Sequence, residues 1–267
     1  MKAEDASRKS HLTGSQKLKN LPLSTLLPIL TFLILYIGLE ILIKLTGIPR
    51  IVLPTPTAII ADTVRNFPVD LWPHFLVSLK VIVFGFFIAI PLGVAMAAIF
   101  SQFPIIVKAV SPFIILLVVT PVITIVPILI LWLGTDPNVR ILAVVLQATP
   151  IITLNTLSGF SMVENEKLEL MKSMGASRSQ TFFKIIFPNA LPQVFTGIKL
   201  GCIFSTIGAI SADFVAGNVG LGFRVLHYSG LIMTEMAYGT ILIVALIGII
   251  LYLVASSIEK KVIVWRK

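Results

Sequence analysis

Residues 169–193, ELMKSMGASRSQTFFKIIFPNALPQ, interrupt a chain that is otherwise strongly apolar. The first half of this stretch continues a run with Glu164, Glu166 and Glu169 in its earlier part and Lys172 near its end, an order that complements a helix macrodipole. Gly175 follows directly, at the position where a left-handed residue commonly caps the C-terminus of a helix. The sequence therefore predicts a short helix that stops at Gly175.

A second short helix is predicted immediately afterwards. The tetrapeptide SRSQ matches a capping box, with Ser177 as the N-cap and Gln180 at the third helical position. The helix is expected to continue through TFFKIIF and to end at Pro188, because proline breaks the hydrogen-bond ladder of a helix interior. Residues 161–193 are thus predicted to hold two helices that meet at a bend.

Each of these helices can present an apolar face. Leu170 and Met174 lie four residues apart in the first helix, and Phe182 and Ile186 lie four apart in the second. Amphipathic helices of this kind either rest on lipid headgroups or dock onto a partner protein. The patterns alone leave both interpretations open.

The composition places the chain in a membrane. Hydrophobic residues make up 57% of the sequence, charged residues only 12%, and the mean hydropathy is +1.00, whereas about a quarter of the residues of a soluble domain are charged. The net charge of +9 does not indicate nucleic-acid binding, since the basic residues neither form one patch nor alternate with exposed aromatic residues. Cys202 is the only cysteine, so no intrachain disulfide can form.

Six apolar runs approach or exceed the roughly 20 residues that cross a bilayer as a helix. The predicted spans are residues 26–45, 76–100, 105–134, 141–160, 194–216 and 238–257. The third contains TPVITIVP and is predicted to be one kinked span, because threonine hydroxyls can satisfy backbone groups that proline frees. Between the first two spans we expect an external loop with one short helix that starts at Pro56. Residues 1–25 form the tail, and residues 26–267 form the transmembrane domain.

The distribution of Lys and Arg predicts the orientation. Most of the 21 basic residues fall in the N-terminal tail, in residues 161–193 and their flanks, or at the C-terminus. These regions share one side if the chain crosses the membrane six times, and the positive-inside rule assigns that side to the cytoplasm. We therefore expect a multi-pass membrane protein with both termini in the cytoplasm.

Polar residues inside the spans are the candidates for a solute pathway. They are Thr120, Thr124, Gln147, Thr149, Thr153, Asn155, Ser205 and Asp213. The fourth span is the strongest candidate for lining the pathway because four of its polar residues surround Pro150. For any single residue, hydrogen bonding between helices is the competing interpretation. Glu40 and Lys44, which are four residues apart in the first span, are expected to form a structural ion pair.

The interrupting stretch also resembles a known motif. Glu169, Gly175 six residues later, the GAS of residues 175–177 and Pro188 resemble the EAA loop of ABC-importer permeases. Leu170 and Met171 stand where that family usually has two alanines. The sequences LPTP, LWLG and ADFVAGNVGLG, at residues 53–56, 131–134 and 212–222, resemble the nitrate/sulfonate/taurine-type permeases, in which glutamate is commoner at the position of Asp213.

The resemblance implies an all-α polytopic permease of the type I importer kind. It implies a homodimer in the lipid bilayer that works with two cytoplasmic ABC ATPase subunits and an extracytoplasmic solute-binding protein. The residues implied to couple the permease to the ATPase are Glu169, Gly175, Ala176, Ser177 and Pro188. The favoured solute is an oxyanion or organic sulfonate such as nitrate, taurine or an alkanesulfonate, and the alternative is a thiamine-precursor pyrimidine or another small organic molecule.

The sequence itself argues against an ATPase site in this chain. It has no phosphate-binding loop of the G-x-x-x-x-G-K-[ST] type, so ATP and Mg²⁺ are expected on the partner ATPase, with no cofactor or metal on the permease and no enzyme activity of its own. A secondary transporter is a more distant alternative, but it would need a coupling-ion site and usually an internal repeat. A membrane scaffold would not explain polar residues in three consecutive spans.

Overall fold

A computed structural model describes residues 23–134 and 136–265, and all of the secondary structure in these ranges is helical. The fold is therefore all-α, as the sequence predicts. The predicted tail, residues 1–25, lies almost entirely outside the described residues. The chain divides into two compact units, Met1–Ala61 and Asp62–Lys267, and each is described separately.

The first unit contains α3 (Leu23–Thr46) and the beginning of α4 (Pro56–Asn66). The Glu40 side chain is buried, and its Oε1 accepts from Lys44 Nζ at 2.8 Å, which confirms the predicted ion pair. The same carboxylate accepts from the Thr57 backbone N–H at 3.1 Å and from the Thr57 hydroxyl at 2.8 Å. Glu40 therefore also stabilises the N-terminus of α4, where a negative charge is favoured.

The second unit begins within α4 and continues through eleven further helical segments. They are η1 (Phe67–Leu71), α5 (Trp72–Ser101), α6 (Pro104–Val119), α7 (Val122–Leu133), α8 (Asn138–Ser161), α9 (Asn165–Ser173), α10 (Arg178–Thr181), η2 (Phe182–Ile186), α11 (Phe187–Ala216), α12 (Leu221–Gly230) and α13 (Thr234–Val262), where η marks a π-helical turn.

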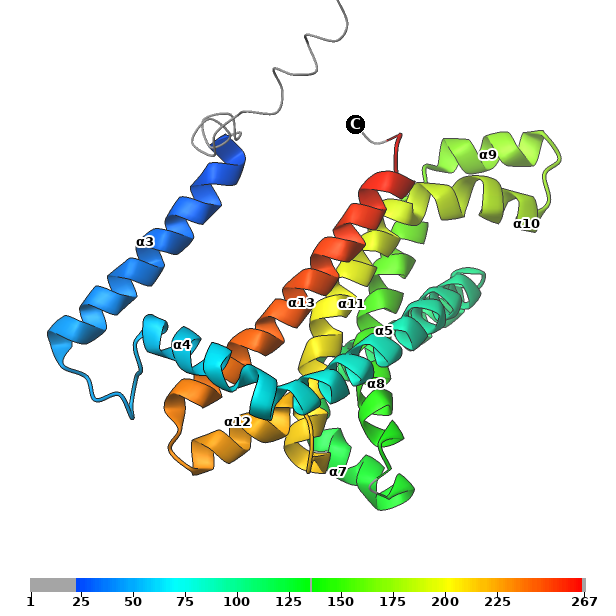
Figure 1. Cartoon of the computed structure of the whole chain (residues 1–267). Coiled ribbons are helices and arrows are strands. Elements are labelled where there is room, and N and C mark those ends of the chain that lie inside the picture. Colours follow the sequence, from blue (N-terminus) through cyan, green and yellow to red (C-terminus); the bar gives the residue numbers. More distant parts are fainter. Residues whose placement is uncertain (1–22, 135, 266–267) are drawn as a thin grey trace, which may run out of the picture. The chain divides into compact units, whose positions relative to one another are not determined.

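The core of this unit is built around α8, which packs against both α5 and α11 (Figure 1). Glycines on α11 let these backbones approach closely. A Cβ atom added at Gly197 would lie 2.9 Å from Asn155 Cβ, and one added at Gly201 would lie 2.9 Å from Ile152 Cδ1. Small residues serve this purpose in membrane helices, where van der Waals packing replaces the hydrophobic effect between helices. We therefore treat α8 and α11 as one tightly packed pair.

Several helical segments are long and apolar enough to cross a bilayer. They are Pro56–Ser101, Asn138–Ser161, Arg178–Ala216 and Thr234–Val262, with a fifth if α6 and α7 together make one span. This count covers only helices that are described in full, and α3 lies over the first predicted span. The six-span topology stays a prediction.

The third predicted span differs from the expectation of one kinked helix. Thr120 and Pro121 are both extended, and α6 and α7 meet at 95°. A proline disfavours helical geometry in the residue before it, which explains why the break falls at Thr120. With 16 and 12 residues, the helices are about 24 and 18 Å long, so neither alone crosses the roughly 30 Å hydrocarbon core.

Two predicted helix ends are wrong for a shared reason. The helix that starts at Pro56 does not end in an external loop but continues to Ser101, and the helix that starts after Ser177 does not end at Pro188 but continues to Ala216. In both, a π-helical turn comes before the proline. The N–H of the residue before Pro73 or Pro188 bonds to a carbonyl five residues back, so the ladder is already rearranged where the proline removes its donor.

Candidate coupling loop and membrane pathway

The bend between α9 and α10 is built by a Schellman motif. The Gly175 N–H donates to the Lys172 carbonyl and the Ala176 N–H donates to the Met171 carbonyl, both at 3.0 Å. These two bonds satisfy the last carbonyls of α9 and need a left-handed residue at the first position after the helix. Gly175 has a φ of +72°, which confirms the predicted glycine cap.

The start of α10 is fixed just as firmly. The Ser177 hydroxyl accepts from the Gln180 N–H at 3.3 Å, and the Gln180 side chain accepts from the Ser177 N–H at 2.8 Å. This is the predicted capping box with both hydrogen bonds present. Only three residues therefore separate α9 from Ser177, and the caps on either side hold the angle between the two helices.

The loop has an inward apolar face. Phe182 stacks edge-on against Phe160 at the end of α8, with ring centroids 5.4 Å apart, and Ile186 packs in the same cluster. Ala176 is half-buried beside Leu168 and Phe182, in a hollow between α9 and the helix that follows it. The inward face fixes the loop to the ends of the membrane helices.

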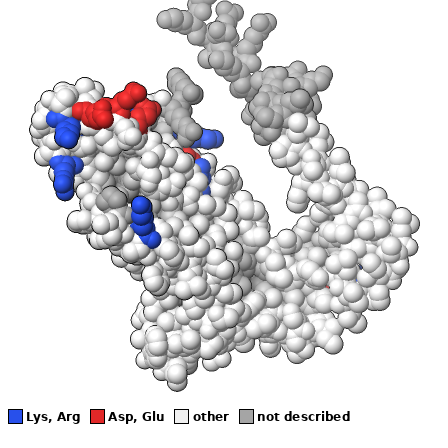
Figure 2. Space-filling model, turned by 180° about the vertical axis from the view of Figure 1, so that it is seen from behind, with Lys and Arg blue, Asp and Glu red and all other residues white. Residues whose placement is uncertain are grey.

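A second apolar face points away from the protein. Leu170, Met174 and Phe183 are 60%, 73% and 67% exposed, and we call these three residues the loop tip. Glu169 is exposed beside them. Figure 2 shows acidic and basic side chains gathered at the end of the molecule that carries α9 and α10, while most of the remaining visible face is uncharged. An apolar tip surrounded by charges is typical of a surface that binds another protein or a membrane.

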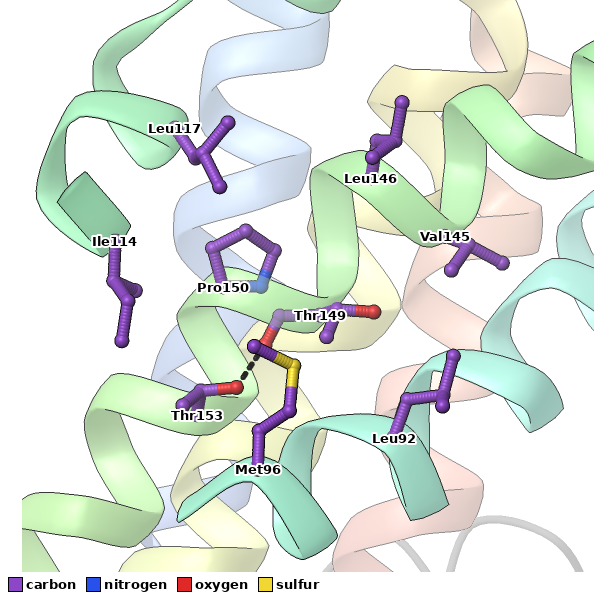
Figure 3. A pocket seen from close by; sticks show the side chains of 9 residues that line it. All are labelled: Leu92, Met96, Ile114, Leu117, Val145, Leu146, Thr149, Pro150 and Thr153. Carbon is purple, nitrogen blue, oxygen red and sulfur yellow. Dashed lines mark hydrogen bonds between the residues drawn. The ribbon is translucent and has the colours of Figure 1, made fainter. Parts of the chain in front are cut away.

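The polar residues of α8 lie on two different faces. Gln147 and Asn155 pack over the glycines of α11, because a Cβ atom added at Gly208 or Gly197 would lie 3.1 or 2.9 Å from their Cβ atoms. Thr149 and Thr153 instead line a cavity between α5, α6 and α8 (Figure 3). The cluster that the sequence groups around Pro150 is therefore divided between a helix interface and a cavity.

The remaining candidates differ in their surroundings. At the break between α6 and α7, the Thr120 and Thr124 hydroxyls each donate at 2.7 Å to a backbone carbonyl, those of Leu116 and Pro121. The Ser205 hydroxyl is buried on α11 and has no hydrogen-bond partner among the described residues. Neither threonine is brought to the cavity beside α8.

Asp213 is fully buried near the C-terminal end of α11 and joins several elements. Its carboxylate accepts from the Ser78 hydroxyl at 2.7 Å and from the Gly222 N–H at 3.3 Å, and it pairs with Arg140 at 3.5 Å. Ser78 in turn accepts from the Leu221 N–H at 2.7 Å. Asp213 therefore fastens the start of α12 to α5, α8 and α11, an arrangement that stabilises the fold rather than exposing a carboxylate to a solute.

Sequence reasoning did not identify Ser78 and Arg140 as partners of Asp213, because they lie 135 and 73 residues away along the chain. One signal was present in GNVGLG, the glycine-rich sequence after the acid. Gly220 has a φ of +113°, and a Cβ atom there would clash with the Asp213 carboxylate. The glycines allow this backbone to wrap around the buried acid.

The fold and these sequence features agree with comparisons to known proteins. The family described as binding-protein-dependent transport system inner membrane component matches residues 89–264. The formylaminopyrimidine transport permease protein ThiX of Halalkalibacterium halodurans is 29% identical over 244 residues, which cover 90% of this chain and 96% of that protein. The taurine transport system permease protein TauC of Escherichia coli is 26% identical over 73% of this chain and 71% of its own length.

A solved structure shows the same fold. A chain of the MetNI methionine ABC transporter, in an inward-facing conformation, superposes with a TM-score of 0.57, and the match covers 75% of this chain and 98% of that one at 20% sequence identity. The protein therefore belongs to the inner membrane components of binding-protein-dependent transport systems, the permeases of type I ABC importers.

Proposed function

We propose that this permease forms a homodimer that binds two ABC ATPase subunits through the α9–α10 loop and receives its solute from an extracytoplasmic binding protein. ATP and Mg²⁺ bind to the ATPase subunits, and the permease itself catalyses no reaction. The observation that carries the proposal is the loop tip, Leu170, Met174 and Phe183, which is exposed although the helices that carry it are capped and packed. The alternative, in which the two helices only rest on lipid headgroups, does not need so rigid a bend.

The continuous helix after Ser177 explains how a signal from the ATPase reaches the membrane. Arg178–Ala216 is one helical segment of 39 residues, which corresponds to about 58 Å at 1.5 Å per residue. Displacement of the loop therefore moves α11, and α8 moves with it because the two helices are packed through glycine contacts. Rocking of packed helices as rigid bodies is a common form of two-state transition, and here it would open the pathway on alternate sides.

Site-specific cross-linking tests the docking surface. The only native cysteine, Cys202, is buried, so a cysteine introduced at Met174 supplies the reactive thiol. We expect Met174→Cys to cross-link to the ATPase subunit in membranes, with a yield that changes when ATP is added. Asn138→Cys, which is exposed at the opposite end of α8, is the matched control. Failure of Met174→Cys to cross-link in a complex that hydrolyses ATP would contradict the proposed dock.

We also propose that the chain lies in a bacterial inner membrane with both termini in the cytoplasm. Lys199 on α11 pairs with Glu259 on α13 at 2.6 Å, which is consistent with the loop and the C-terminal end of α13 sharing one side. The names of the relatives include a formylaminopyrimidine and taurine, so membership of the family indicates a small solute. Two proposals for its chemistry remain, an oxyanion or organic sulfonate, and a thiamine-precursor pyrimidine or another small organic molecule.

A further inference from the structure

The cavity beside α8 has properties that select a chemical class of solute. Its volume is about 230 Å³, and it lies between α5, α6 and α8. Figure 3 shows its wall, in which side chains such as Met96, Leu117 and Val145 surround Pro150. Pockets that bind drug-sized ligands have volumes of about 300–1,000 Å³, whereas an apolar cavity of about 150 Å³ holds benzene. The size therefore suits a molecule with one ring or a comparable small body.

Two polar groups in this wall lack their usual partners. Only 8% of the surface of Thr149 is exposed, and its hydroxyl has no hydrogen-bond partner among the described residues. Pro150 has no N–H, so the Leu146 carbonyl one turn earlier loses its helical donor. The Thr149 oxygen is itself enclosed by the protein, so the surface that a solute would meet in this cavity is almost wholly apolar. The Thr153 hydroxyl is engaged instead, because it donates to the Thr149 carbonyl at 2.9 Å and lies 3.2 Å from the Gly93 carbonyl.

No charged side chain is among the nine residues that line the cavity. Arg140 on α8 and Lys199 on the neighbouring α11 do not line the cavity and are already paired, with Asp213 and Glu259 respectively. An anion that entered this space would lose its hydration without gaining a positive partner, and burying an unpaired charge is strongly unfavourable. An uncharged molecule loses far less and gains apolar contacts.

We propose that this cavity is a contact site on the solute pathway, and that it takes an uncharged solute of about one ring in size which is held mainly by apolar contacts. The proposal rests on the importer function above and deepens it. Of the two classes that the sequence resemblance implies, it favours the second, a small organic molecule, over an oxyanion or sulfonate, and it adds that this molecule is uncharged.

Thiol modification tests the charge preference without knowledge of the solute. Thr149→Cys is made with Cys202→Ala and treated with methyl methanethiosulfonate, which is neutral, or sulfonatoethyl methanethiosulfonate, which is anionic. Ser179→Cys on exposed α10 is the control, and it gives the ratio of the modification rates with the neutral and the anionic reagent at a freely accessible thiol. We expect the ratio at Thr149→Cys to favour the neutral reagent at least tenfold more than at Ser179→Cys. Equal ratios would overturn the proposal, as would protection from both reagents, which would show that lipid or the partner copy fills the cavity.

A second readout tests whether the cavity lies on the transport route. ATP hydrolysis stimulated by the binding protein is measured for the assembled Thr149→Cys complex before and after modification by the neutral reagent, and a loss of at least fivefold is expected. Thr156→Cys is the control, because Thr156 is also buried on α8 with an unpaired hydroxyl but does not line the cavity. Unchanged hydrolysis after full modification would overturn the cavity's role. Absence of stimulation in the complex that carries only Cys202→Ala would instead contradict the importer function, while the rate ratios would still report on the cavity.

Discussion

Replacement of Gly175 by valine should uncouple the permease without unfolding it. A Cβ atom at this position would meet nothing within 4 Å, so the substitution causes no steric clash with the rest of the chain. The cost comes from the backbone alone, because a β-branched residue resists the φ of +72° that the Schellman motif requires. Strain of this kind is worth about 1–3 kcal/mol, which corresponds to a shift of about 5- to 150-fold in an equilibrium.

A graded series separates the bend from other effects. Asparagine tolerates the left-handed region better than alanine or valine, so loss of function should increase in the order Gly175→Asn, Gly175→Ala, Gly175→Val. Gly230→Val is the matched control, since Gly230 is also in open space but does not have a positive φ. The assays are membrane insertion, co-purification with the ATPase and ATP hydrolysis stimulated by the binding protein. Full stimulation in Gly175→Val, or equal loss in all three variants, would refute the role of the bend.

Three further predictions address the dock, the buried acid and the topology. Glu169→Ala should insert normally but weaken co-purification with the ATPase, with Glu166→Ala as a control; equal behaviour of the two would argue against a specific role for Glu169. Asp213→Asn should lower the melting temperature, because loss of one partner of a buried ion pair costs about 3–5 kcal/mol, whereas exposed Asp136→Asn should not; unchanged melting would contradict the structural role of the acid. Reporter proteins fused at Asn20, Asn218 and Lys267 should report the cytoplasm, the outside and the cytoplasm, in that order. An external signal from the Lys267 fusion would contradict six spans.

The local features that the sequence predicted correctly are those decided within a few residues. The cap at Gly175 and the capping box at Ser177 depend on backbone geometry and on side chains at most three positions away, and both are present. The Glu40–Lys44 pair is set by one turn of helix. Such interactions follow from spacing alone because the helix itself brings the groups together.

The predictions that failed concern how a proline is accommodated. Pro188 was predicted to end a helix, and the helix from Pro56 was predicted to be short, yet Pro188 and Pro73 both lie inside long helical segments directly after π turns. Pro121 does break its helix, and the bend of 95° is sharper than a kink. The difference depends on whether the backbone before the proline can widen into a π turn. No residue type next to Pro73, Pro121 or Pro188 predicts which of the three helices will break.

The candidate pathway could be predicted only to the level of a helix. Counting polar residues identifies α8, but the side of the helix that each residue occupies depends on which neighbour packs there. The glycines of α11 take the face of Gln147 and Asn155, and only Thr149 and Thr153 remain on the cavity side. The same packing joins α8 to α11, whose helical segment begins at the α9–α10 loop and carries Asp213 near its far end. Under the proposed function, a push at this loop would act through one helix on both the cavity wall and the buried acid, so the ATPase would change solute access without any contact of its own with the solute.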